Sequence, residues 1–157
     1  MIYIASGWWK PGHLDAIDHL TEHFRENNLE YYSPKDHNLL PENSTREQQE
    51  AVFLKNVEMI RRCEIMFARI DDYDPGTIWE MGAAYQCSLV DHWLGDQALP
   101  NCKIVAWSLV PNRELNMMLA VGCDGFINGW PDIYQFFQNG WIDWEVLKRW
   151  NQKPIVK

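Results

Sequence analysis

The sequence has no block of basic residues and no long apolar run. Its 14 Lys and Arg residues are scattered and face 22 Asp and Glu residues, giving a formal net charge of −8. Proteins hold DNA or RNA largely through clustered positive charge, so we expect no nucleic acid polymer as a partner. A membrane helix needs about eighteen consecutive apolar residues. Neither that run nor a signal-peptide pattern is present, so we expect a cytoplasmic protein without a membrane partner.

Metal and dinucleotide motifs are also missing. The five histidines do not cluster with acids, and the four cysteines lack the spacing of metal ligands, so we expect no metal site. Reduced, mostly buried thiols are the expected state of Cys63, Cys87, Cys102 and Cys123. The dinucleotide fingerprint G-x-G-x-x-G is absent. No repeat or linker divides the 157 residues, so we expect one domain spanning residues 1–157.

What the sequence does contain is an alternation of strand and helix patterns. The predicted strands are residues 2–5, 29–32, 65–70, 103–109 and 123–127. The predicted helices are residues 13–26, 44–62, 77–89, 116–119, 130–137 and 141–150, with Phe53, Leu54, Val57 and Ile60 of the second one facing inward. The alternation predicts an α/β fold. Five strands favour a flavodoxin-like three-layer sandwich with a parallel sheet in the order 2-1-3-4-5.

The third predicted strand leads directly into a cluster of acids. Asp71, Asp72 and Asp74 follow an almost continuous apolar run, and Pro75-Gly76 then breaks the chain. We expect Thr77 to be the helix N-cap and Glu80 to fall in the first helical turn, where the helix dipole favours an ionised carboxylate. Two carboxyl groups with different roles are the working parts of glycosyl transfer. The alternative is a plain turn followed by a capped helix.

This order places two segments in one crevice. In a 2-1-3-4-5 sheet the switch point lies between the first and third strands, at their carboxyl ends. The Tyr3 end of the first strand should therefore meet the loop from Asp71 to Glu80. A loop with two adjacent tryptophans, Trp8 and Trp9, follows the first strand. These rings either anchor the loop to the core or contact a flat ligand.

Three segments resemble the nucleoside 2-deoxyribosyltransferase family. The stretch Asp74-Pro-Gly-Thr-Ile-Trp-Glu80-Met-Gly82 is similar to its D-x-G-T-x-x-E-x-G signature. Residues 2–9 resemble its first strand and aromatic loop, and Asn116-Met117-Met118 resembles its Asn-Leu-Met segment. The three matches come in the family order between residues 2 and 118.

The resemblance implies movement of a deoxyribosyl group from one nucleobase to another, a reaction of nucleotide salvage. Glu80 would attack the anomeric carbon to form a covalent glycosyl-enzyme, and a second base would then attack it with overall retention of configuration. Asp74 would hydrogen-bond to the base or exchange a proton with it, and Tyr3 would hold Glu80 in position. No cofactor is needed, because the substrate supplies the leaving group.

The resemblance also assigns the binding residues. Trp8 or Trp9 would stack on the base, and Asn56 would orient it, although an ordinary solvated helix face is the other interpretation of Asn56. Asn116 would bind the sugar 5′-hydroxyl of a neighbouring subunit, which implies a homodimer or a hexamer built as a trimer of dimers. Asp71, Gly76 and Met118 complete the expected substrate-binding set, although Met117 and Met118 are also ordinary core residues.

Other functions stay open at this stage. A nucleoside or nucleotide N-glycohydrolase would use water in place of the acceptor base, and a nucleotide-sensing module would have no need for a nucleophile. Relatives that cleave nucleoside monophosphates have a Ser where this chain has Asp74, and an acid there repels a 5′-phosphate, so an unphosphorylated substrate is favoured. The chain departs from the family at Ala5-Ser6, in an extra loop at residues 91–101 and in its polar end, residues 152–157. Base preference and the choice between ribose and deoxyribose are therefore open.

Overall fold

The structure is a computed structural model that describes residues 1–157 except 38, 95–101, 112, 139 and 148–157. Five parallel strands form its main sheet in the order β2-β1-β3-β4-β5. The predicted flavodoxin-like α/β fold and its strand order are therefore confirmed. The strands are β1 (Ile2–Ala5), β2 (Tyr31–Tyr32), β3 (Ile65–Arg69), β4 (Lys103–Ser108) and β5 (Gly125–Asn128). The helices are α1 (Pro11–Glu26), α2 (Pro34–His37), α3 (Arg46–Arg62), α4 (Pro75–Leu94), α5 (Met117–Gly122) and α6 (Trp130–Phe136).

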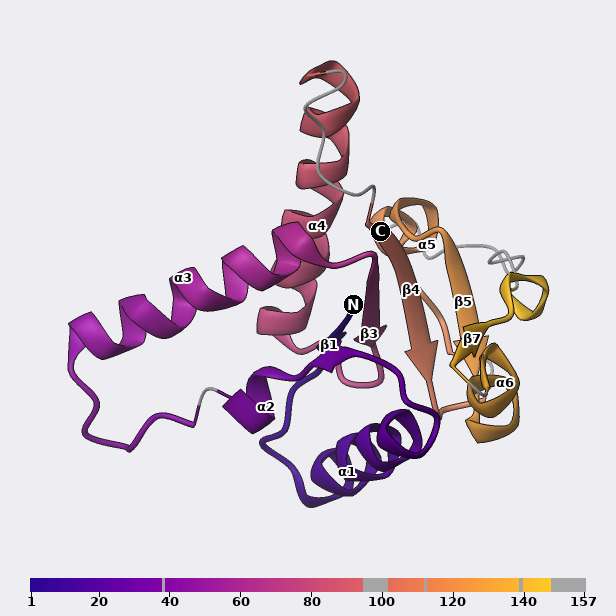
Figure 1. Ribbon diagram of the computed structural model, residues 1–157, viewed down its shortest axis with the longest axis horizontal. Helices are drawn as coiled ribbons and strands as arrows, with labels where there is room; N and C mark the ends of the chain where they lie inside the picture. Colours follow the sequence, from indigo (N-terminus) through magenta and orange to yellow (C-terminus); the bar gives the residue numbers. More distant parts are fainter. Residues whose placement is uncertain (38, 95–101, 112, 139, 148–157) are drawn as a thin grey trace.

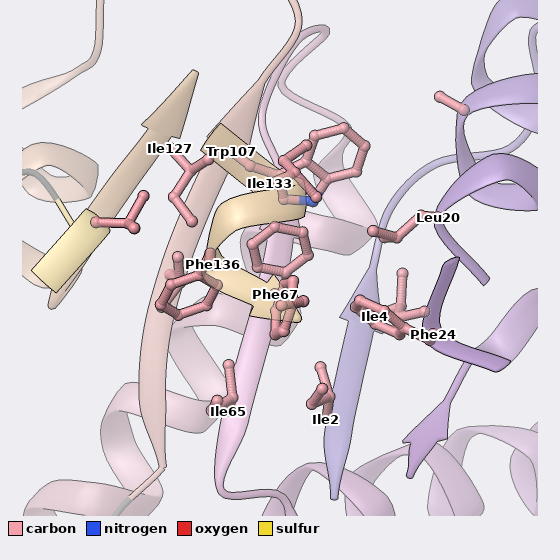
Figure 2. Close-up of a cluster of buried hydrophobic side chains, with 14 residues drawn as sticks. Ile2, Ile4, Leu20, Phe24, Ile65, Phe67, Trp107, Ile127, Ile133 and Phe136 are labelled. Carbon is pink, nitrogen blue, oxygen red and sulfur yellow. The ribbon is translucent and has the colours of Figure 1, made fainter. Parts of the chain in front are cut away.

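Both faces of the sheet are covered by helices (Figure 1). On one face, side chains of α1 and α6 pack against alternate strand residues, including Phe67 and Trp107, whose rings stack with centroids 5.4 Å apart. Figure 2 shows this cluster, with Phe24 from α1 and Phe136 from α6 meeting the strands. On the other face, α3, α4 and α5 cover the intervening residues, which include Tyr3 and Met66. The central strand β3 is buried along its whole length, on both of its faces, as its apolar run indicates.

Helix α3 differs from expectation in its burial. Its capping box at Thr45 and Gln48 is present, and Ile60 is buried. Phe53 and Leu54, however, are 49% and 64% exposed. Figure 1 shows the reason: α3 extends away from the sheet, and only its carboxyl-terminal end lies against it. The amphipathic pattern was interpreted correctly as a helix, but the prediction that Phe53 and Leu54 face the core was wrong.

The carboxyl-terminal segment was also predicted incorrectly. Instead of a helix over residues 141–150, the chain forms an antiparallel pair, β6 (Phe137–Gln138) with β7 (Trp141–Ile142), followed by a short 3₁₀ helix, η2 (Trp144–Val146). Gly140 has a φ of 74°, a left-handed conformation suited to a tight turn between strands. Residues 95–101, which include most of the expected extra loop, and residues 152–157 lie outside the described part of the chain.

Candidate active site

The side chains expected to share one site come from β1, the loop after β3 and the start of α4. Tyr3 points from β1 to the helical face occupied by α4, and its side chain is fully buried. Its hydroxyl donates a hydrogen bond to Glu80 Oε1 at 2.6 Å. The structure thus brings together Tyr3 and Glu80, which lie 77 positions apart in the sequence.

Asp74 fixes the start of the helix that carries Glu80. Its Oδ2 accepts hydrogen bonds from the backbone N–H of Thr77 at 2.8 Å and from the Thr77 hydroxyl at 3.1 Å. Asp74 is therefore the N-cap, and Pro75 occupies the first helical position, which suits its missing N–H. The prediction of Thr77 as the cap was wrong by three residues. Because the helix begins at Pro75, Glu80 is its sixth residue and lies in the second turn rather than the first.

The environment of Glu80 raises its pKa to about 7. Burial is the main cause, since it disfavours the charged form; the Tyr3 hydrogen bond lowers the pKa, and the negative charge of Asp74 raises it. Burial and the neighbouring Glu80 also raise the pKa of Tyr3, so its hydroxyl remains a donor. The helix dipole was expected to favour an ionised Glu80. In the structure burial raises the pKa of Glu80 to near neutral pH instead.

The aromatic loop comes close to Asp74 at one point. A Cβ atom added at Gly7 would lie 3.0 Å from Asp74 Cγ and 3.0 Å from its Oδ1, so only glycine fits here without displacing the carboxylate. Trp8 and Trp9 follow directly, with ring centroids 5.3 Å apart. Trp8 is partly buried and Trp9 is 77% exposed, so Trp9 is not a core anchor. Gly76, also predicted for the site, is exposed beside the Asp74 carboxylate.

Asn56 reaches the site through an intermediary that sequence reasoning missed. Tyr32, at the end of β2, donates from its hydroxyl to Asn56 Oδ1 at 3.1 Å. Its ring also stacks on that of Tyr3, with centroids 5.6 Å apart. Tyr3 and Tyr32 are register partners in neighbouring strands, so an aromatic residue at the end of the second predicted strand was the available signal.

Asp71 and the Asn116 segment lie apart from this constellation. Buried Asp71 forms an ion pair with Arg69 Nε at 2.8 Å and accepts hydrogen bonds from the Ser108 hydroxyl and the Leu109 backbone N–H, which joins the ends of β3 and β4. Asn116 is the exposed N-cap of α5, with Oδ1 accepting from Met118 N–H at 2.9 Å. Met118 is 72% exposed. Among the described residues, no hydrogen bond joins Asn116 to Tyr3, Asp74 or Glu80 of the same chain.

The described residues contain neither a candidate metal site nor a candidate membrane helix. Within the described residues, no group of three or more His, Cys, Asp or Glu side chains could hold a metal ion. Among the helices of the same residues, none has the length and apolarity required to cross a membrane.

All four cysteines are free, and the Sγ atoms of buried Cys63 and Cys102 lie 3.1 Å apart.

Comparisons with known proteins identify the family and the fold. The family model for nucleoside 2-deoxyribosyltransferases matches residues 2–89, more than half of the chain. A 2-deoxyribosyltransferase from Bacillus psychrosaccharolyticus has a similar structure, with a TM-score of 0.69 and 24% identity, over 99% of this chain and 98% of that one. A conserved protein from Enterococcus faecalis matches with a TM-score of 0.54 and 19% identity, over 74% and 67% of the two chains. A search of curated proteins gave no match. The matched segment contains Tyr3, Asp74 and Glu80, and the chain belongs to the nucleoside 2-deoxyribosyltransferase family.

Proposed function

We propose that this protein transfers a 2-deoxyribosyl group between nucleobases through a covalent intermediate on Glu80. The observation that carries the proposal is the 2.6 Å hydrogen bond from Tyr3 to Glu80 Oε1 beside the Asp74 cap. Tyr3 occupies one carboxylate oxygen and fixes its orientation. Oε2 is then the oxygen that attacks the anomeric carbon.

In the first step, Glu80 bonds to C1′ as the bond from C1′ to the base nitrogen breaks. The base leaves with the electrons of that bond and takes a proton from the Asp74 carboxyl group, and the incoming base returns a proton to Asp74 in the second step. Asp74 Oδ2 accepts the two capping hydrogen bonds, so we assign the exchange with the base to Oδ1. A second base then attacks C1′ from the side that the first base left, and Glu80 is released. Two inversions give net retention.

The remaining binding roles follow from the placement of the side chains. We assign base stacking to Trp8 or Trp9, because the loop that carries them approaches Asp74 at Gly7. Asn56 orients the base from the Tyr32 side. The negative charge of Asp74 favours an unphosphorylated nucleoside over a nucleotide. Free nucleosides and nucleobases in the cytoplasm are the corresponding substrates, and nucleotide salvage is the corresponding process.

We further propose that the active form is a homodimer, or a hexamer of three such dimers, with Asn116 serving the neighbouring subunit. Support comes from the exposed apolar surface around it: Met117, Met118 and Val121 of α5 are 40%, 72% and 74% exposed. An apolar groove of about 290 Å³ separates α5 from α4, with Ile78, Met81 and Tyr85 on its α4 side. Burial of such a surface against a second copy is the expected outcome for a patch of this kind.

Base exchange tests the reaction directly. The protein is incubated with a deoxynucleoside, with and without a different free base, and the products are separated. A new deoxynucleoside, formed only with the second base, supports transfer. Parallel double-reciprocal lines over a grid of donor and acceptor concentrations support the covalent route, and intersecting lines contradict it. Release of free deoxyribose at one rate regardless of the acceptor identifies the N-glycohydrolase instead.

A further inference from the structure

The loop that carries Trp8 and Trp9 contacts the loop between β3 and α4 (residues 70–74), here called the catalytic loop, at a second point. This contact lies on the other side of the tryptophans from Gly7. Asp72 Oδ1 lies 3.3 Å from Lys10 Nζ, and Asp72 Oδ2 forms an ion pair with His13 Nε2. The His13 side chain is only 14% exposed, whereas that of Lys10 is 65% exposed. One carboxylate thus contacts both an exposed lysine and a partly buried imidazole.

The start of α1 gives this carboxylate a further reason to be there. Lys10 is the N-cap of α1, but no side chain caps the helix, and its first turn has no acid. A helix amino terminus carries partial positive charge that a nearby anion stabilises. Asp72 supplies that anion from the loop after β3, beside the N-cap residue and beside His13, the third residue of α1.

Trp8 and Trp9 lie between the two contacts in the sequence. On one side Gly7 packs against Asp74, and on the other Lys10 pairs with Asp72. Two residues of the catalytic loop therefore hold both ends of a segment that is only two residues long. Trp9 is mostly exposed, whereas Trp8 is partly buried, so core packing does not by itself fix the position of the Trp9 ring.

We propose that Asp72 is a positioning residue for the nucleobase: its ion pairs with Lys10 and His13 hold Trp8 and Trp9 over the base site. Asp72 does not touch the sugar or take a proton. It acts through the tryptophans, so it affects the affinity for the nucleoside more than the chemical step. This inference rests on the proposed function, since it assigns a role in the same site.

The test compares Asp72→Asn with Asp15→Asn, which removes the same charge from an exposed position on α1. We expect Asp72→Asn to raise KM for the deoxynucleoside about 2- to 5-fold, the size of effect that loss of an exposed ion pair gives, with kcat changed less than about two-fold. Lys10→Met should change KM in the same direction. Asp15→Asn should leave both constants unchanged.

Acrylamide quenching of tryptophan fluorescence measures the accessibility of the tryptophan rings and needs no substrate. Asp72→Asn should increase quenching, and the increase should disappear in a Trp8→Phe, Trp9→Phe background. A double-mutant cycle then tests the route of action: once both tryptophans are replaced by alanine, Asp72→Asn should raise KM no further.

Each failure has a distinct meaning. An active wild-type protein whose KM is unaffected by Asp72→Asn overturns the inference and leaves the proposed function standing. Unchanged quenching, or an effect on KM that persists fully without the tryptophans, also overturns it. A wild-type protein with no base exchange or hydrolysis overturns the proposed function itself. The quenching experiment then still tests whether Asp72 holds the two tryptophans in place.

Discussion

The hydroxyl of Tyr3 and Oε1 of Glu80 are 2.6 Å apart, within a site where burial raises the pKa of Glu80 to about 7. The two side chains come from β1 and α4, and the parallel pairing of β1 with β3 brings them together. Tyr3 thus fixes one oxygen of the proposed nucleophile and also favours its charged form. Both effects can be measured separately.

Replacement of Glu80 by alanine or glutamine should abolish base exchange. Removal of a covalent nucleophile typically lowers the rate by roughly a thousand-fold or more. The circular dichroism spectrum should be unchanged, and Glu22→Ala, an exposed position on α1, is the matched control. Near-normal turnover by a folded Glu80→Ala protein would exclude Glu80 as the nucleophile.

The rate should depend on pH through the ionisation of Glu80. Only the carboxylate attacks, so kcat/KM for the donor should rise with pH and level off above about 7. The Tyr3 hydrogen bond lowers the pKa of Glu80, so Tyr3→Phe should move this rise to higher pH. A pH profile unchanged by Tyr3→Phe would show that another group controls the rate.

Stability should depend on pH in the opposite direction. The pKa of Glu80 in the folded protein, about 7, exceeds its ordinary value of 4.5, so the folded state binds the proton more tightly. The resulting stabilisation is present below pH 4.5 and is lost as pH rises through 7, a change of roughly 3 kcal/mol. Glu80→Gln should remove this change and unfold at a higher temperature than wild type at pH 8. Equal melting temperatures at pH 8 would contradict the assigned pKa.

Gly7→Ala should impair activity with little effect on folding. The added Cβ would lie 3.0 Å from Asp74 Cγ, a separation that real Cβ atoms rarely have, so either the loop or the Asp74 side chain must shift. We expect at least a ten-fold loss of kcat/KM, since small misplacements of catalytic groups are costly. Gly12→Ala, where no atom lies within 4 Å of an added Cβ, is the control. Equal activity of the two variants would show that the loop adapts.

A shared active site predicts complementation between inactive variants. Glu80→Ala and Asn116→Ala proteins are mixed under conditions in which mass spectrometry of tagged chains shows subunit exchange. A mixed dimer then has one site with both defects and one with neither, and random exchange should restore roughly a quarter of wild-type activity. If Asn116 serves its own subunit, every site keeps one defect and mixing restores nothing.

Several elements could be predicted because their signals are local. The apolar run at residues 65–70 indicated a strand buried on both faces, and all of β3 is buried. The expected start of the second helix at residue 44 was close to the observed one, since the N-cap is Thr45 and α3 begins at Arg46. Burial of Phe53 and Leu54 depends on what lies opposite the helix, which no local pattern records. Likewise, the predicted helix at residues 141–150 took no account of Gly140, whose φ of 74° suits a turn.

The part of the site that depends only on strand order could be predicted. Carboxyl ends of adjacent parallel strands must meet, which placed Tyr3 near the catalytic loop. The partners of Asp71 were not foreseen, although Arg69 stands two residues before it, on the same side of an extended chain. Substrate binding by Asp71 remains a prediction, and its contacts with Arg69, Ser108 and Leu109 give it a structural role.

Asp74 caps α4 in addition to its proposed role toward the base, and the capping restricts which residues can replace it. Its side chain must begin α4, so acceptable replacements are the residues that cap helices well: Asn, Ser and Thr besides Asp. These differ in charge while leaving Glu80 at the same place on the helix. A single substitution at this position can therefore change which substrates are repelled without dismantling the nucleophile. Ser at this position would keep the same helix start and remove the repelling charge.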